Sequence, residues 1–127
     1  MENTTLLREG RNLLLQLHKL LVDFEREGYE MLNGRMTAGQ FLNVLLEDQG
    51  FVWLKEFSNL IVIIDEMFAQ KDGYDAGAVE AELHRLRDLI GLTDVDENFR
   101  IKYQYALQES PEIAGKHAEL KTLLAGK

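Results

Sequence analysis

The sequence predicts an all-α protein: an antiparallel up-and-down bundle of about four main helices with one or two short helices in addition. Apolar residues recur with helical spacing along most of the chain, and no stretch of four or more residues alternates strictly between apolar and polar. The connections between these periodic stretches are short, which favours antiparallel neighbours. With 127 residues, of which 46% are hydrophobic and 28% charged, we expect one domain over residues 1–127 with an unaided core.

A long amphipathic helix is predicted from about Thr5 to Leu32. Its apolar stripe contains Leu6, Leu13, Leu14, Leu17, Leu20, Leu21, Phe24, Met31 and Leu32. Gly10 and Gly28 fall in the same stripe, where a small residue lets a neighbouring helix approach closely, at about 1 kcal/mol of helix propensity each. Gly28 could end the helix early, and Gly34 is the later alternative.

Two more helices are predicted between residues 37 and 70. Thr37 and Gln40 have the spacing of a capping box, so a short helix begins there and ends near Gly50. Its apolar residues are Phe41, Leu42, Leu45 and Leu46. A third helix over about residues 51–70 is expected to be the central helix of the bundle. Its stripe consists of Trp53, Phe57, Leu60, Ile61, Ile64 and Phe68.

The last part of the chain predicts three further helices after a turn at residues 71–75. The first of them carries Val79, Leu83, Leu86 and Ile90 and ends at Gly91. Thr93 or Asp94 is expected to cap the next helix. Ser110 and Pro111 stop that helix and begin the last one, with Ser110 as N-cap and Pro111 in the first helical position.

Composition argues against several classes of protein. The absence of cysteine excludes disulfides, thiolate metal sites and cysteine nucleophiles. The net charge of −8 is concentrated between Thr37 and Glu109, with 14 acids and 6 bases, and such a surface repels nucleic acids and anionic membranes. No apolar run is long enough to span a membrane. The first residues read poorly as a signal peptide, so a soluble, cytoplasmic protein is expected.

The sequence contains no complete metal, cofactor or catalytic motif. Asp94, Asp96 and Asn98 match the first side-chain ligands of an EF-hand calcium loop, but Phe99 and Tyr105 stand where that loop needs glycine and glutamate. None of the three histidines follows a glutamate at the spacing used by di-metal bundles. Nucleophile elbows and phosphate-binding loops are also missing. We therefore expect no metal, no cofactor and no enzymatic activity.

A second, narrower apolar stripe on the first helix is the feature that most suggests a function. Leu15, Val22 and Tyr29 recur every seven residues, with His18 between the first two, on a flank about 130° from the main stripe. Either the shorter helices of the chain cover this flank or a partner does. The leading interpretation is a small helical protein-interaction or regulatory module that self-associates, most simply as a homodimer.

Two other functions stay open. A helical bundle could bind a small ligand or a metal ion between its helices, lined by Trp53, Asp65 and Tyr103 together with His18. Asp65 lies about 100° from the centre of its stripe, at the boundary of the core, so a hydrogen bond to a neighbouring helix is the preferred explanation for it. The acidic middle of the chain could also act as a decoy for nucleic-acid-binding proteins.

Overall fold

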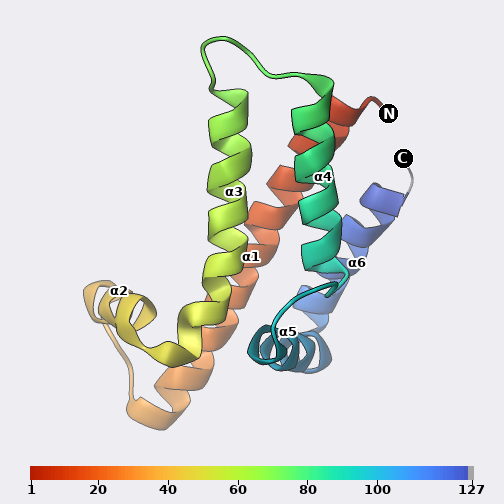
Figure 1. Ribbon diagram of the computed structural model, residues 1–127. Helices are drawn as coiled ribbons and strands as arrows, with labels where there is room; N and C mark the ends of the chain where they lie inside the picture. The colour runs from red at the N-terminus through yellow and green to blue at the C-terminus, as the bar shows by residue number, and fades with distance from the viewer. Residues whose placement is uncertain (126–127) are drawn as a thin grey trace.

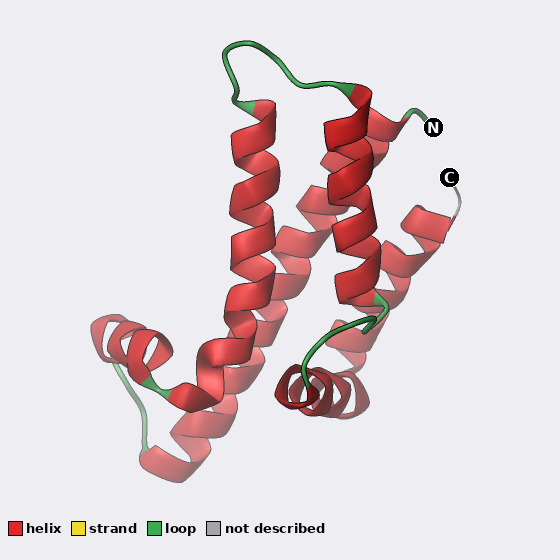
Figure 2. Cartoon of the chain, in the orientation of Figure 1, coloured by secondary structure: helices red, strands yellow, loops and turns green. Residues whose placement is uncertain are grey.

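A computed structural model describes residues 1–125, and within them the chain forms helices and no strand (Figure 2). The prediction of an all-α fold is confirmed. The helices are α1 (Asn3–Asn33), α2 (Ala38–Glu47), the 3-10 helix η1 (Gln49–Leu54), α3 (Lys55–Phe68), α4 (Ala76–Ile90), α5 (Glu97–Glu109) and α6 (Pro111–Ala125). In this part of the chain, no helix combines the length and the apolar character that crossing a membrane requires.

The central helix of the bundle is α1, whereas the sequence predicted the helix that begins near residue 51. The 31-residue α1 packs against α3, α4 and α6 along its length (Figure 1). Gly10 explains the close approach of α4, because a Cβ atom at Gly10 would lie 2.8 Å from Cδ2 of Leu86. A small residue in the stripe therefore does allow a neighbouring helix to come close.

The relation of α1 to α3 is fixed by contacts at both of their ends. Arg11, near the start of α1, binds Asp65 near the end of α3. The rings of Tyr29 and Phe51, at the other end, have centroids 5.8 Å apart. The two segments therefore run in opposite directions. In Figure 1, α3 and α4 lie side by side and are joined by the upper loop, while α5 is seen end-on beneath α4.

The segment predicted as one helix over residues 51–70 is divided. Residues 49–54 form η1 and the α-helix begins only at Lys55. The side chain of Asp48 accepts a 2.7 Å hydrogen bond from the backbone N–H of Gly50, and its carbonyl accepts one from Phe51 at 3.1 Å. These short-range bonds begin the tighter 3-10 turn. They also end α2 at Glu47, before the predicted stop at Gly50.

Most helix ends lie where local chemistry places them. The capping box of Thr37 and Gln40 forms, and Gly34 ends α1 with a φ of 89°, which favours glycine. Ser110 Oγ accepts the N–H of Ile113 at 3.2 Å, so Ser110 caps α6 as predicted. The predicted cap of α5 is wrong. Asp96, two or three residues later, accepts the N–H of Phe99 at 2.7 Å.

Candidate interaction surface

The short helix α2 lies outside the bundle, beside the C-terminal end of α1 (Figure 1). Its main packing partner is η1. The only buried side chain of α2 is Phe41, whose ring meets that of Phe51 edge-on with centroids 5.9 Å apart. The guanidinium of Arg26 lies over the Phe41 ring, 5.0 Å from the ring centre, as a cation–π contact. Phe41, together with the half-buried Val44 and Leu45, thus holds α2 against the rest of the protein.

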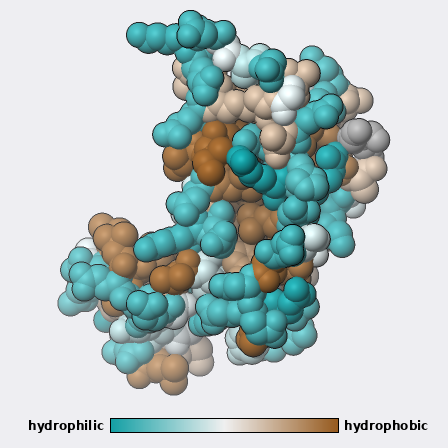
Figure 3. All heavy atoms as spheres, in the orientation of Figure 1, coloured by the Kyte–Doolittle hydropathy of each residue, from teal (hydrophilic) through white to brown (hydrophobic). Residues whose placement is uncertain are grey.

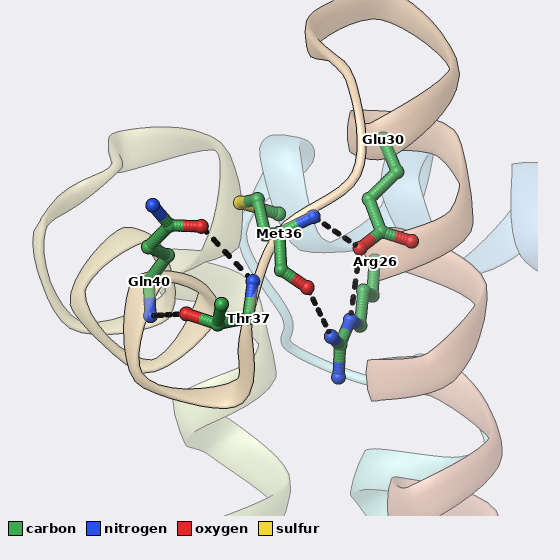
Figure 4. A network of polar contacts seen from close by, with 5 residues as sticks. All are labelled: Arg26, Glu30, Met36, Thr37 and Gln40. Atoms are coloured by element: carbon green, nitrogen blue, oxygen red, sulfur yellow. Dashed lines mark hydrogen bonds and ion pairs between the residues drawn. The ribbon is translucent and has the colours of Figure 1, made fainter.

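A polar network fixes the segment between α1 and α2 (Figure 4). Glu30 accepts the backbone N–H of Met36 at 3.0 Å and the Nε of Arg26 at 3.3 Å. Arg26 also donates through Nη2 to the carbonyl oxygen of Met36 at 2.9 Å. The capping box follows at once, with distances of 2.9 and 3.2 Å between Thr37 and Gln40. These bonds set the position at which α2 begins.

Glu30 is the acid that holds this network together. The backbone N–H of Met36, and to a smaller extent Arg26 and Arg35, lowers the pKa of the Glu30 carboxyl below its usual value, although desolvation opposes the shift. The carboxylate form therefore predominates at neutral pH. The network that places α2 is intact under those conditions.

The exposed face of α2 is mostly apolar and carries no charge. Leu42 and Leu46 are 53% and 60% exposed, and at a spacing of four they share one side of the helix. No charged residue occurs from Met36 to Leu46. We call Ala38, Gly39, Leu42, Asn43 and Leu46, all exposed, the α2 face. In Figure 3, apolar side chains gather over this part of the molecule.

Two apolar residues in the last turns of α1 are exposed as well. Met31 and Leu32 are 86% and 88% exposed, although the sequence placed both in the core stripe. That placement is wrong because α1 extends beyond the helices that pack on its stripe (Figure 1). Leu42 and Leu46, two of the apolar residues of the second predicted helix, are exposed for a related reason. The helical period identifies an apolar side but does not say whether another element covers it.

The predicted second stripe of α1 is partly covered by the chain itself. The His18 ring stacks on Phe57 with centroids 6.3 Å apart, and Tyr29 packs against Phe51. Val22 is half-buried against the core, whereas Leu15 stays 44% exposed. The η1–α3 segment supplies both aromatic neighbours. An interface through these four residues stays a prediction, with Leu15 its most accessible member.

The predicted ligand-lining residues are brought together only in part. The rings of Trp53 and Tyr103 are buried with centroids 6.2 Å apart. Phe57 and Phe99 pack against both, at centroid distances of 5.4 to 5.9 Å, and so fill the space around them. Asp65 is exposed and lies about three helical turns after Trp53 along the η1–α3 segment. A ligand site formed jointly by all three residues has no support in this arrangement.

Asp65 is bound to a neighbouring helix, as one of the two sequence interpretations expected. Its two carboxylate oxygens accept hydrogen bonds from Nε and Nη2 of Arg11, both at 2.8 Å. The pair borders an open surface cleft of about 510 Å³. On the same cleft, the guanidinium of Arg8 lies 3.9 Å from the centre of the Phe68 ring. The charged groups of this cleft are thus already engaged by protein groups.

Three titratable side chains, those of Tyr103, His117 and His18, are wholly or partly buried. The Tyr103 hydroxyl lies 2.7 Å from Nδ1 of His117, and burial raises the pKa of Tyr103 well above its usual value. Burial also lowers the pKa of His117, with a further contribution from Lys121, and it lowers the pKa of His18. Within residues 1–125, no group of three or more acidic or histidine side chains is placed to hold a metal ion.

The surface with the strongest case for binding a partner is therefore the α2 face. Its residues are exposed, uncharged and, apart from Asn43, apolar. The polar network around Glu30 and the packing of Phe41 on Phe51 position the helix that carries them. Nothing in the sequence periodicity indicated that the α2 face would be exposed, but the uncharged run from Met36 to Leu46 was a visible signal.

Comparison of the chain with protein families, with curated proteins and with solved structures gives no match.

Proposed function

We propose that this chain is a small, cytoplasmic, helical protein-interaction module that self-associates, and that the α2 face is its working surface. One observation carries the proposal: a helix outside the bundle presents two large apolar side chains, Leu42 and Leu46, from a stretch of eleven residues without a charge. Solvent-facing helices ordinarily carry charged residues, and exposed apolar patches mark interaction sites.

The rigid attachment of α2 supports the same proposal. Binding costs free energy when a flexible segment must be ordered. The contacts among Arg26, Glu30 and Met36, followed by the capping box, order the start of α2 before any partner arrives. Phe41 fixes the opposite side of the helix against Phe51. The apolar face is therefore presented in a defined orientation.

The alternative functions have less support. Binding of a small ligand between helices would need space near Trp53 and Tyr103, where aromatic side chains pack closely. Asp65, the polar residue of that hypothesis, is paired with Arg11. The decoy hypothesis continues to rest on the net charge of −8 alone. Neither alternative uses the exposed apolar residues of α2.

Light scattering coupled to gel filtration tests self-association directly. We expect the apparent mass to rise from that of one chain to that of two as the protein concentration increases, because a homodimer is the simplest closed assembly. A mass that stays at one chain up to the highest attainable concentration would contradict self-association. Addition of salt should weaken the dimer only modestly, since apolar contacts supply most of the attraction.

A further inference from the structure

We infer that the self-association proceeds by packing of α2 against α2 of a second copy, with the two helices antiparallel about a two-fold axis near Leu42 and Asn43. This inference rests on the proposed function and specifies its partner and its surface. In a two-fold dimer each copy contributes the same patch, so the patch must be complementary to itself. The α2 face meets that requirement in shape and in charge.

The shape of the α2 face tapers along the helix. Its N-terminal end is made of small residues, Ala38 and Gly39, and nothing lies within 4 Å of the position a Cβ atom would take at Gly39. Its C-terminal end carries the large side chain of Leu46. Gly39, Leu42 and Leu46 follow one another at spacings of three and four, so they share one side of the helix.

Antiparallel packing places the small end of one helix against the large end of the other. Gly39 then lies opposite Leu46 of the second copy, and Leu42 lies beside the axis. The distance from residue 39 to residue 46 is about 10 Å along the axis, so one pair of leucines from each copy covers the contact. A parallel pair would set Leu46 against Leu46 and leave a gap at Gly39.

The charges at the two ends of α2 favour the same arrangement. Arg35 precedes the helix, and Glu47 and Asp48 stand at its C-terminal end. Arg35 and Glu47 are both exposed. In an antiparallel pair, Arg35 of each copy comes near Glu47 and Asp48 of the other copy, so the two-fold axis gives two such contacts. The two helix dipoles also oppose each other favourably in this orientation.

The contact is small, which sets the expected strength of the dimer. A helix of ten residues is about 15 Å long, so the area buried falls at the lower end of the range for specific interfaces, below about 1,200 Å². Interfaces of this size belong to weak, transient complexes. We therefore expect a reversible dimer whose population depends on protein concentration.

Substitution of the two leucines is the main test. Leu42→Lys and Leu46→Lys place a charge in the contact, and because lysine and leucine have similar helix propensities, α2 itself should stay helical. Leu15→Lys is the matched control, since Leu15 is an exposed leucine of α1 outside the α2 face. Circular dichroism establishes that each variant is folded, and light scattering then measures its mass. We expect the two α2 variants to be monomeric at concentrations where Leu15→Lys and the unchanged protein are dimeric.

Charge reversal tests the antiparallel orientation. Arg35→Glu and Glu47→Arg should each weaken the dimer, by roughly two- to tenfold, as expected for exposed ion pairs. The double variant Arg35→Glu/Glu47→Arg should regain much of the lost affinity, because the pairs are restored with their signs exchanged. Two single variants that weaken the dimer without recovery in the double variant would overturn the antiparallel arrangement.

The outcomes separate this inference from the proposed function. A dimer that survives both leucine substitutions and dissociates with Leu15→Lys overturns the α2 contact and assigns self-association to the flank of α1. A dimer insensitive to all three substitutions overturns the α2 contact as well. An unchanged protein that never exceeds the mass of one chain contradicts self-association itself.

Discussion

The Tyr103 hydroxyl and Nδ1 of His117 lie 2.7 Å apart, so a partly buried hydrogen bond joins α5 to α6. The ring of His117 stands almost perpendicular to that of Tyr103, at 85°. A neutral His117 whose proton is on Nε2 accepts a hydrogen bond from the hydroxyl at Nδ1. Protonation of His117 would place a hydrogen on Nδ1, so the hydroxyl could then only accept from it and the bond would reverse its direction. The donor and acceptor roles of this pair therefore depend on the charge of His117.

The partial burial of His117 and His18 predicts that the protein loses stability in mild acid. Burial lowers the pKa of both His117 and His18, so the folded protein takes up protons less readily than the unfolded chain. Stability is then fully present above the unfolded pKa of about 6.5 and falls as the pH drops below it. We expect the urea midpoint at pH 5.5 to be lower than at pH 7.5.

A pair of variants assigns this pH effect to the two half-buried histidines. His117→Gln removes one of these titrating groups, so the difference in midpoint between the two pH values should shrink. His84→Gln is the control, because the His84 side chain is 76% exposed. It should keep the pH dependence of the unchanged protein. An equal dependence in all three proteins would contradict the assignment.

A second prediction concerns the sole tryptophan. Trp53 is buried, and its Nε1 donates to a carboxylate oxygen of Glu25 at 3.0 Å, while Lys102 lies 3.5 Å from the same oxygen. Glu25→Ala leaves the indole N–H without that acceptor and should lower the free energy of unfolding by about 1–3 kcal/mol. Glu25→Gln keeps an acceptor and should cost less. Tryptophan fluorescence during urea unfolding measures both, and equal losses would contradict a hydrogen-bond role.

Some of the fold could be predicted because its causes lie within a few residues. The capping box of Thr37 and Gln40 and the Ser110–Pro111 helix start depend on bonds to the third following residue. Apolar stripes likewise follow from the period of the helix. The position of Asp65 at the edge of its stripe was predicted in the same way. Its partner Arg11, 54 residues away, was not, because sequence periodicity does not say which helices become neighbours.

The exposure of the α2 face could not be predicted from the sequence, because periodicity does not say which helices become neighbours. Leu42, Leu46, Met31 and Leu32 fit apolar stripes as well as the buried leucines do, yet they are exposed. Whether a stripe is covered depends on the lengths and contacts of other elements, here on α2 packing against η1 rather than the bundle. The second stripe of α1 shows the converse. Tyr29 and His18 are partly covered by Phe51 and Phe57, from a different segment.

The two glycines of the α1 stripe should respond differently to substitution. Gly28 is exposed within the helix and has nothing within 4 Å of a Cβ position, so Gly28→Ala should stabilise the protein by about 0.5–1 kcal/mol. At Gly10 the added methyl group would meet Leu86 at 2.8 Å, which offsets the gain in helix propensity. Gly10→Leu should destabilise by about 1–3 kcal/mol through overpacking. Urea unfolding of Gly28→Ala, Gly10→Ala and Gly10→Leu checks this, and a larger gain for Gly10→Ala than for Gly28→Ala would contradict it.

The last prediction links the α1–α2 network to binding. Glu30→Ala removes the acceptor shared by the Met36 N–H and Arg26, so the start of α2 should become less ordered. Backbone amides of residues 38–47 should then exchange hydrogen faster, and the dimer should weaken by roughly fivefold, the equivalent of about 1 kcal/mol for one hydrogen bond. Glu30→Gln keeps an acceptor for Met36 and serves as the matched control, with a smaller effect on both. Faster exchange in α2 without weaker self-association would show that the order of α2 does not contribute to binding. Unchanged exchange would show that Phe41 and the capping box are sufficient to hold the helix.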